Sequence, residues 1–413
     1  MVPNGWNRIA LEKIAEVRSG VAKGKKGLKA PIELPYLRVA NVQDGHVDLT
    51  EVKTIEIEQD KLERYSLKYG DVLMNEGGDY DKLGRGDVWL GQIEPCLHQN
   101  HVFAVRPNQD IVDSFFLAAL AASNYGKTYF LSCAKRSTNL ASINSTQIKE
   151  FPVLVPPLPE QKKIAKILST WDKAISTTEK LIATSQQQKK ALMQQLLTGK
   201  KRLLDKNGVR FGGEWKKVRL GNMADMNSGG TPKSNIEEYY GGNIPWVSIA
   251  DMTKQGKWIS STEKNLTELG LENSSARIYP KNSVLYAMYA SIGECSIAQV
   301  PLSSSQAILG IRPKSELNFE FLYFFLTSLK EKIKLQGQQG TQSNLNAGMV
   351  KDFVLYLPDM EEQQKIVAVL AAADQEITTL QQQMDQLKQE KKALMQQLLT
   401  GKRRVKVDEN VTA

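Results

Sequence analysis

The sequence predicts an α/β (α+β) fold with two pseudo-repeated globular domains, separated by two long helices that pair as an antiparallel coiled coil. Three observations support this prediction. The chain contains two copies of one unit, each copy mixes strand and helix patterns, and each copy ends in a long stretch without Pro or Gly. The copies are clearest where Lys189–Arg202 matches Lys391–Arg404 at 13 of 14 positions, 202 residues further along the chain. Such repetition indicates two copies of one structural unit.

The repeat extends upstream of these segments, but unevenly. Phe151–Ile164 aligns with Phe353–Ile366, and Gly5–Leu11 aligns with Glu214–Leu220. The matching positions are apolar alternations and turn residues, whereas the stretches between them share little. Two scaffolds of one fold with different loops suit a chain that presents two different recognition surfaces.

Composition narrows the class of protein. A length of 413 residues suggests two or three domains, and 41% apolar with 24% charged residues is typical of globular chains. No uncharged apolar run approaches the 18 residues of a membrane span, and the N-terminus lacks the apolar core of a signal peptide. Cys96, Cys133 and Cys295 fit a reducing cytoplasm. The net charge of +9 favours a polyanionic partner.

Within each copy, short apolar runs bounded by Gly, Pro, Asn or Asp predict strands. The expected strands are Pro35–Val42, Asp71–Met74 and His101–Val105 in the first copy, and Pro245–Met252, Ser283–Met288 and Ala307–Ile311 in the second. Helices are expected at Asp113–Ser123 and Phe319–Lys334.

Two much longer helices are expected after the globular segments. Neither Pro nor Gly occurs in Glu160–Thr198 or Asp359–Thr400. Gly199 and Gly401 stand where C-terminal caps belong, and Lys and Arg beyond them suit the negative end of the helix dipole. Each helix would be roughly 58 Å long at about 1.5 Å per residue.

Apolar residues in both helices recur at alternating steps of three and four. The first seam is Ile164, Leu168, Trp171, Ile175, Thr178, Ile182, Ser185, Leu192 and Leu196, interrupted at Lys189. The second is Ile366, Leu370, Ala373, Ile377, Leu380, Met384, Leu387, Leu394 and Leu398, interrupted at Lys391. This spacing predicts a coiled coil. The alternative is two amphipathic helices, each packed on its own domain.

Antiparallel pairing of the two helices would place the globular domains at opposite ends. Each helix would then end near the root of the other domain, where its KKALMQQLLTGK segment can dock. The predicted organisation is a domain at 1–156, a helix at 157–200, a linker at 201–213, a domain at 214–357, a helix at 358–401 and a tail at 402–413.

Motifs that carry catalysis are absent from the sequence. It contains no GxxxxGK[ST] phosphate loop, no glycine-rich dinucleotide or S-adenosylmethionine turn, and no Asn-Pro-Pro-aromatic motif of adenine methyltransferases. The run Cys96–His101 resembles a metal-ligand pattern, but alternate residues of a strand point to opposite faces. We interpret it as a strand with polar edge residues. A binding protein without catalytic residues, metal or cofactor of its own is therefore expected.

Several polar loops are candidates for DNA contact. Lysines in Gly-containing loops can follow a phosphate backbone, and Arg, Asn and Gln can bond base edges in the major groove. The phosphate candidates are Lys23, Lys25, Lys26 and Lys233. The base-reading candidates are Lys135, Arg136, Thr138 and Asn139 in one copy, and Gln338, Gln339, Thr341, Gln342 and Asn344 in the other. Further candidates are Lys82, Arg85, Gln299 and Gln306. The same loops also fit an ordinary solvated surface.

The order of these segments resembles a known family. Leu158–Lys201, Phe211–Met252 and Glu361–Arg404 carry the resemblance, which covers nearly the whole chain. They are similar to the specificity (S) subunit of type I restriction-modification systems, which act in DNA methylation and phage defence. The resemblance implies two target recognition domains, each of which reads half of a split site in double-stranded DNA, with the paired helices as a spacer.

The resemblance also implies partners. Two methyltransferase (M) subunits would dock on one copy of this chain and methylate adenine N6 with S-adenosylmethionine. Restriction (R) subunits, which are motors and nucleases, would add ATP- and Mg-dependent cleavage in a bacterial or archaeal cytoplasm. This chain itself would be non-catalytic. The alternatives are a coiled-coil scaffold that binds no DNA, an enzyme with an unrecognised site, and the specificity subunit of a modification-only system.

Overall fold

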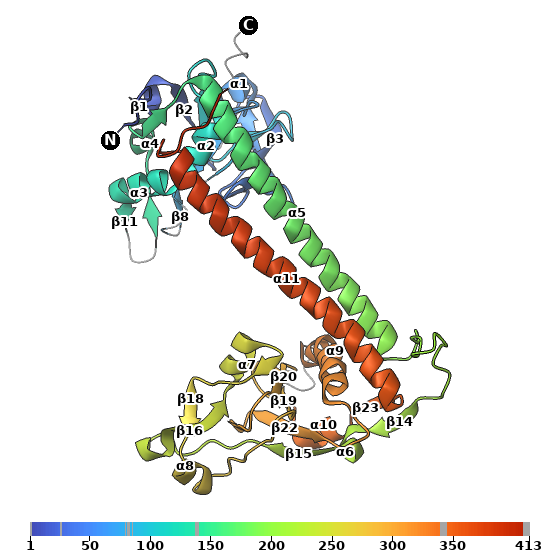
Figure 1. The fold of residues 1–413 in the computed structure, drawn as a ribbon. Helices are drawn as coiled ribbons and strands as arrows, with labels where there is room; N and C mark the ends of the chain where they lie inside the picture. The colour runs from blue at the N-terminus through green and yellow to red at the C-terminus, as the bar shows by residue number, and fades with distance from the viewer. Residues whose placement is uncertain are drawn as a thin grey trace. The chain divides into compact units, whose positions relative to one another are not determined.

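The chain folds into two compact units, each of which contains segments from both long helices. The computed structural model describes residues 2–24, 27–78, 80, 83–84, 86–136, 140–338 and 345–407. Unit 1 comprises Met1–Glu179 with Gln382–Ala413, and unit 2 comprises Lys180–Gln381 (Figure 1). Within the described part, no helix has the length and apolar character needed to span a bilayer.

Unit 1 is built on small, mostly antiparallel sheets, and its β3–β9 pair is parallel. Strand β10 (Val102–Pro107) is the middle strand of a sheet in the order β2–β10–β7, and it is almost fully buried. The other sheets have the orders β6–β3–β9, β11–β12–β8, β1–β13 and β4–β5. The strand bounds are β1 Asn7–Ala10, β2 Ala15–Ser19, β3 Pro31–Leu37, β4 Val42–Gln43, β5 His46–Val47, β6 Lys53–Glu58, β7 Val72–Asn75, β8 Gly77–Gly78, β9 Leu97–His98, β11 Lys135–Arg136, β12 Ala141–Ser142 and β13 Pro152–Val155. The helices are α1 Leu62–Tyr65, α2 Ser114–Ala122, α3 Asn124–Cys133 and α4 Ser145–Lys149.

Unit 2 repeats this plan with a longer main sheet. Its sheets have the orders β15–β22–β19–β20–β17, β18–β16–β21 and β14–β23. The strand bounds are β14 Lys216–Arg219, β15 Ala224–Ser228, β16 Tyr240–Val247, β17 Trp258–Ile259, β18 Lys264–Leu266, β19 Val284–Ala287, β20 Cys295–Ala298, β21 Ser303–Ser304, β22 Ile308–Pro313 and β23 Val354–Leu357. The helices are α6 Leu220–Met223, α7 Ile249–Gln255, α8 Glu268–Glu272, α9 Phe319–Gln338 and α10 Ala347–Lys351. The triplets β2–β10–β7 and β15–β22–β19 correspond, as do the pairs β1–β13 and β14–β23.

The expected strand Pro245–Met252 is wrong beyond Val247. Ser248 caps helix α7 instead, because its hydroxyl accepts from the Asp251 amide at 3.2 Å while the Asp251 carboxylate accepts from the Ser248 amide at 2.9 Å. This reciprocal capping satisfies donors that a helix start otherwise leaves unpaired. In the first copy, the strand expected over Pro35–Val42 ends at Leu37.

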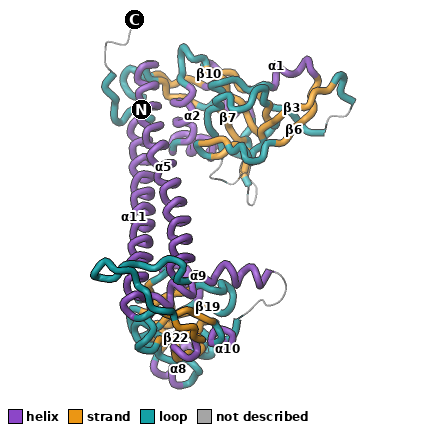
Figure 2. Tube along the Cα trace, turned by 90° about the vertical axis from the view of Figure 1, so that its right-hand side faces the viewer, coloured by secondary structure: helices purple, strands orange, loops and turns teal. Residues whose placement is uncertain are grey.

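The long helices α5 (Leu158–Leu196) and α11 (Met360–Leu398) each contain 39 residues and pair antiparallel, as predicted. In unit 1, Glu179 bonds Lys388 at 3.0 Å and Asp172 bonds Lys391. In unit 2, Ser185 donates to Glu376 at 3.3 Å. As the residue number on α5 increases from 172 to 185, the number of its partner on α11 decreases from 391 to 376, which is the pattern of an antiparallel pair. The two helices lie side by side in both views (Figures 1 and 2).

The pairing excludes the alternative of helices that pack only on their own domains. All the predicted seam positions are buried or half-buried. At their ends they join the cores of the units: Ile164, Leu168 and Leu398 in unit 1, and Leu196, Ile366 and Leu370 in unit 2. The two lysines that interrupt the seams are accommodated by equivalent ion pairs, Lys391 with Asp172 and Lys189 with Asp374.

The first turn of each long helix contains a buried carboxylate that is held by an Arg and a Trp. In unit 1, the Glu160 carboxylate accepts from Arg404 Nε at 2.6 Å and Nη2 at 2.7 Å, and from Trp6 Nε1 at 3.2 Å. The Arg404 guanidinium also lies 5.7 Å from the centroid of the Trp6 ring, a cation–π distance. We call these three residues clamp 1.

Clamp 2 repeats the arrangement in unit 2. The Glu362 carboxylate accepts from Arg202 Nε at 2.6 Å and Nη2 at 2.7 Å, and from Trp215 Nε1 at 2.9 Å. The Glu side chains are only 4% exposed in clamp 1 and 1% in clamp 2. Bidentate Arg–carboxylate pairs are among the stronger hydrogen-bonded contacts. The hydrogen bonds to Glu160 raise the pKa of Arg404 above its usual value.

The clamps hold the end of one long helix at the start of the other. Arg202 follows the C-terminus of α5, and Arg404 follows the C-terminus of α11. Gly199 and Gly401 make the intervening turns with φ values of 71° and 67°, as expected for C-terminal caps. The duplicated KKALMQQLLTGK segments are thus docked in the way that the antiparallel arrangement requires.

A buried Gln beside each clamp fixes the long helix to the globular part. Gln161 accepts from the Asp113 amide at 2.8 Å and donates to the carbonyls of Ile111 and Pro156 at 2.9 and 2.8 Å. Gln363 makes the same set of bonds with Asn318, Glu316 and Pro358 at 2.8, 2.9 and 3.0 Å. Both side chains are fully buried. In each Gln, the side-chain oxygen accepts one hydrogen bond and the side-chain NH₂ group donates two. Both polar groups of each buried amide are therefore hydrogen-bonded.

Clamp 2 gives a direct stability test. Glu362→Gln keeps the side-chain shape but removes the charge that Arg202 faces, so we expect the free energy of unfolding of unit 2 to fall by about 3 kcal/mol. The adjacent exposed Glu361 is the matched control, and Glu361→Gln should change the free energy of unfolding by less than about 0.5 kcal/mol. Urea unfolding of the purified chain, followed by circular dichroism, measures both. Equal losses in the two variants would show that clamp 2 contributes nothing specific.

Candidate nucleic-acid interface

Seven of the sequence-predicted DNA contacts lie within the described residues, and ten lie outside them. Six of the seven lie at exposed positions in the structure: Lys23, Lys135, Arg136, Lys233, Gln299 and Gln306. Gln338 is the last residue of α9. Ten lie outside the described residues: Lys25, Lys26, Lys82, Arg85, Thr138, Asn139, Gln339, Thr341, Gln342 and Asn344. All of these assignments therefore stay predictions.

Lys135 and Arg136 lie on a strand rather than in the expected loop. They form β11, which pairs antiparallel with β12, where Lys135 faces Ser142 and Arg136 faces Ala141. β12 pairs in turn with β8, where Ala141 faces Gly78. Strands β8 and β11 are labelled in Figure 1. We call β11 and β12 the ribbon; they are an edge strand and the middle strand of this three-stranded sheet. The DNA major groove admits a β-ribbon, and Lys135 and Arg136 are exposed on the edge strand of this one.

A hollow of about 510 Å³ lies beside the ribbon. Glu76, His101, Lys135 and Arg136 line it together with the two glycines of β8. The Arg136 guanidinium lies 5.9 Å from the centroid of the Tyr80 ring and donates to the Leu131 carbonyl at 3.2 Å. His101 Nδ1 shares a hydrogen bond with Glu76 Oε2. This part of unit 1 thus combines cations with a carboxylate on one accessible surface.

Sequence reasoning missed Glu76 and His101 as candidates. His101 was included only in a strand with polar edge residues, and Glu76 stands alone between a buried strand and two glycines. The sequence feature that could have pointed to Glu76 is its charge directly after an apolar strand, since Val72–Asn75 is wholly buried. Nothing in the sequence indicates that residues 25 apart bond one another.

The corresponding edge of unit 2 has the same backbone frame. In unit 1, the Glu76 amide donates to the His101 carbonyl at 3.0 Å and the Ile143 amide donates to the Glu76 carbonyl at 2.8 Å. In unit 2, the Met288 amide donates to the Ala307 carbonyl at 2.9 Å and the Leu345 amide donates to the Met288 carbonyl at 3.1 Å. Met288 and Ala307 thus take the places of Glu76 and His101.

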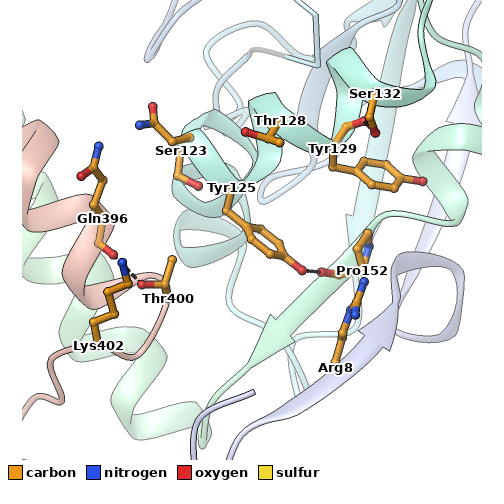
Figure 3. A pocket seen from close by; sticks show the side chains of 11 residues that line it. Arg8, Ser123, Tyr125, Thr128, Tyr129, Ser132, Pro152, Gln396, Thr400 and Lys402 are labelled. Carbon is orange, nitrogen blue, oxygen red and sulfur yellow. Dashed lines mark hydrogen bonds between the residues drawn. The ribbon is translucent and has the colours of Figure 1, made fainter. Parts of the chain in front are cut away.

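A second hollow in unit 1, of about 500 Å³, lies between α3, β1 and the end of α11 (Figure 3). Tyr125 donates its hydroxyl proton to the Pro152 carbonyl at 2.6 Å, and Arg8 and Lys402 supply positive charge at the rim. Burial raises the pKa of Tyr129 to about 12, so this phenol stays neutral at physiological pH.

In the Cys96–His101 run, Cys96, Leu97 and His98 are buried, and Leu97–His98 form strand β9. Burial raises the pKa of Cys96 to about 12 and lowers that of His98 to about 4. The neutral His98 ring bonds the Val102 carbonyl through Nδ1 at 2.6 Å. Both side chains are thus held in uncharged forms within the core. Among the residues that the structure describes, no three His, Cys, Asp or Glu side chains come together as metal ligands.

Comparisons with known proteins agree on one family. The model of the type I restriction modification DNA specificity domain matches residues 3–185 and 212–389. The type I restriction enzyme MjaVIII specificity subunit of Methanocaldococcus jannaschii is 26% identical, over 98% of this chain and 94% of that protein.

Solved structures show the same fold. The HsdS subunit from Thermoanaerobacter tengcongensis superposes with a TM-score of 0.52 at 19% identity, over 97% of this chain and 98% of that one. A chain from a study of the assembly and conformational transition of the type I R-M system gives a TM-score of 0.64 at 18% identity, with the same coverage.

Proposed function

Because the chain belongs to the type I restriction-modification DNA specificity family, with one specificity domain in each half, we propose that it reads a bipartite target in double-stranded DNA. Each unit recognises one half-site. The observation that carries this proposal is the shared frame with different side chains: the accessible Glu76 and His101 in unit 1 correspond to the buried Met288 and to Ala307 in unit 2. Equivalent positions with different chemistry suit two half-sites of different sequence.

The paired helices act as the spacer between the half-sites. Their ends are fixed by two clamps and two buried Gln side chains, and ion pairs such as Glu179–Lys388 set their register. A helix pair anchored in this way resists bending and sliding more than a flexible linker does. The gap between the half-sites is therefore constant.

The chain works as the non-catalytic scaffold of a larger complex. Two methyltransferase subunits dock on the repeated surfaces and methylate adenine N6 with S-adenosylmethionine, while restriction subunits use ATP and Mg²⁺ to cleave unmodified DNA. One copy of this chain has two related docking regions, which matches two copies of one partner. The net charge of +9 supports contact with the phosphate backbone. The complex operates in a bacterial or archaeal cytoplasm.

The proposal predicts the form of the methylation motif. Co-expression of the chain with its neighbouring methyltransferase, followed by genome-wide mapping of methylated adenines, should give two different half-sites with a constant gap. If both units contact one face of the duplex, the half-site centres lie about one helical turn, roughly 34 Å, apart. A single continuous short motif, or a palindrome, would contradict the proposal.

The spacer role predicts a phase effect. Four residues inserted after Gln187 add roughly 6 Å and rotate the following helix by about 40°, which moves the seam off its partner. We expect the complex to be disrupted, or the gap to change with both half-sites kept. Seven inserted residues preserve the heptad and should be tolerated better. The readout is again the methylation map, and an insertion that changed the bases recognised would rule out a spacer role.

A further inference from the structure

The hollow beside the ribbon contains a paired acceptor and donor that suit one particular base pair. We infer that Glu76 and Arg136 together read a C·G pair in the half-site of unit 1, with Glu76 on the cytosine and Arg136 on the guanine. This inference rests on the proposed function and extends it to named side chains and a named base pair.

The backbone brings the two side chains to one place. Glu76 lies between β7 and β8, and Arg136 lies on β11, two strands away across β12. Neighbouring strands are about 4.8 Å apart, so roughly 10 Å separates the outer strands. Since β8 consists of Gly77 and Gly78, that strand adds no side chain, and the middle strand β12 adds only the small Ala141 and Ser142. Glu76 and Arg136 line the hollow together with these four residues.

His101 orients the carboxylate. Its Nδ1 bonds Glu76 Oε2, and the backbone bond from the Glu76 amide to the His101 carbonyl fixes the two residues side by side. The Glu76 side chain is 30% exposed and the His101 side chain is 53% exposed, so both are accessible to a duplex. A carboxylate has about four acceptor positions, and one bond to His101 leaves capacity for a donor from DNA.

Two contacts orient Arg136. The Tyr80 ring lies 5.9 Å from its guanidinium carbon, and the Leu131 carbonyl accepts from Nη2 at 3.2 Å. A guanidinium has five N–H donors, so the bond to Leu131 leaves the others for DNA. A stacked, tethered Arg is better suited to a planar two-bond contact than a freely rotating one.

The chemistry of the pair selects the base pair. In the major groove, cytosine offers the N4 amino donor and guanine offers two adjacent acceptors, O6 and N7. A carboxylate accepts from N4, and an Arg donates two parallel bonds to O6 and N7. An A·T pair gives no single base with two acceptors for Arg, so it matches this arrangement less well. In unit 2, Met288 and Ala307 stand in the corresponding places, and the same reading is not available from them.

The test uses the full chain in complex with its methyltransferase subunit. Binding is measured for duplexes in which each base pair of the wild-type motif is replaced in turn. Glu76→Gln keeps the shape and removes the charge, while Arg136→Lys keeps the charge and removes the two-bond fork. We expect both variants to lose roughly ten- to a hundredfold of the preference at the same C·G position of one half-site, with little change elsewhere.

The matched control is Glu320→Gln in unit 2. Glu320 is 23% exposed and bonds Lys257 at 2.8 Å, so it is an ion-paired carboxylate outside the proposed reading edge. It should leave both half-sites unchanged. If the Glu76 variant fails to assemble, the exposed Arg136→Lys variant decides alone, since it must relax a C·G position.

Other outcomes overturn the inference. Loss at two different positions, equal weakening for all sequences, no change in either variant, or a half-site without C·G would each show that these side chains do not read that pair. Failure of the proposed function is distinguishable from failure of this inference, because the wild-type complex would then show no bipartite motif at all.

Discussion

The rest of the structure depends on the burial of two carboxylates, Glu160 and Glu362, at the first turns of the long helices. A buried carboxylate is strongly unfavourable unless it is paired and hydrogen-bonded. Here the partner of each is an Arg from the far end of the other helix, with a Trp from the start of the globular part as a third member. The need to satisfy these charges therefore brings together chain segments 244 and 160 residues apart. In unit 1 this contact joins two separate stretches of chain, Met1–Glu179 and Gln382–Ala413, whereas unit 2 is the continuous stretch Lys180–Gln381.

A constant frame and variable edges follow from that constraint. The clamps, the buried Gln161 and Gln363 and the central strands repeat almost contact for contact. One difference lies beside this frame, where the accessible Glu76 of unit 1 corresponds to the buried Met288 of unit 2. The backbone frame determines where a side chain lies but not which residue it belongs to. The surface side chains of one unit can therefore change while those of the other unit are kept. This separation is the physical basis of our proposal that one chain contains two independent readers.

Much of the fold was predictable because it rests on local periodicity and on the repeat. Seam spacing predicted the antiparallel helix pair, and Gly199 and Gly401 predicted its caps. The strand beyond Val247 was predicted wrongly because the mutual bonds of Ser248 and Asp251 override an apolar alternation. The clamps and the Glu76–His101 pair were missed for a different reason: their members are distant in sequence, and only the folded chain brings them together.

The central claim is that the two units read DNA independently on one shared frame. It is tested most directly by replacement of residues 1–155 with the matching part of a relative of different specificity, while Gln382–Ala413 is kept so that Arg404 still reaches Glu160. Methylated adenines are then mapped in cells that also express the methyltransferase. The account predicts that one half-site changes to that of the relative, while the other half-site and the gap stay the same. A change in both half-sites together would contradict it.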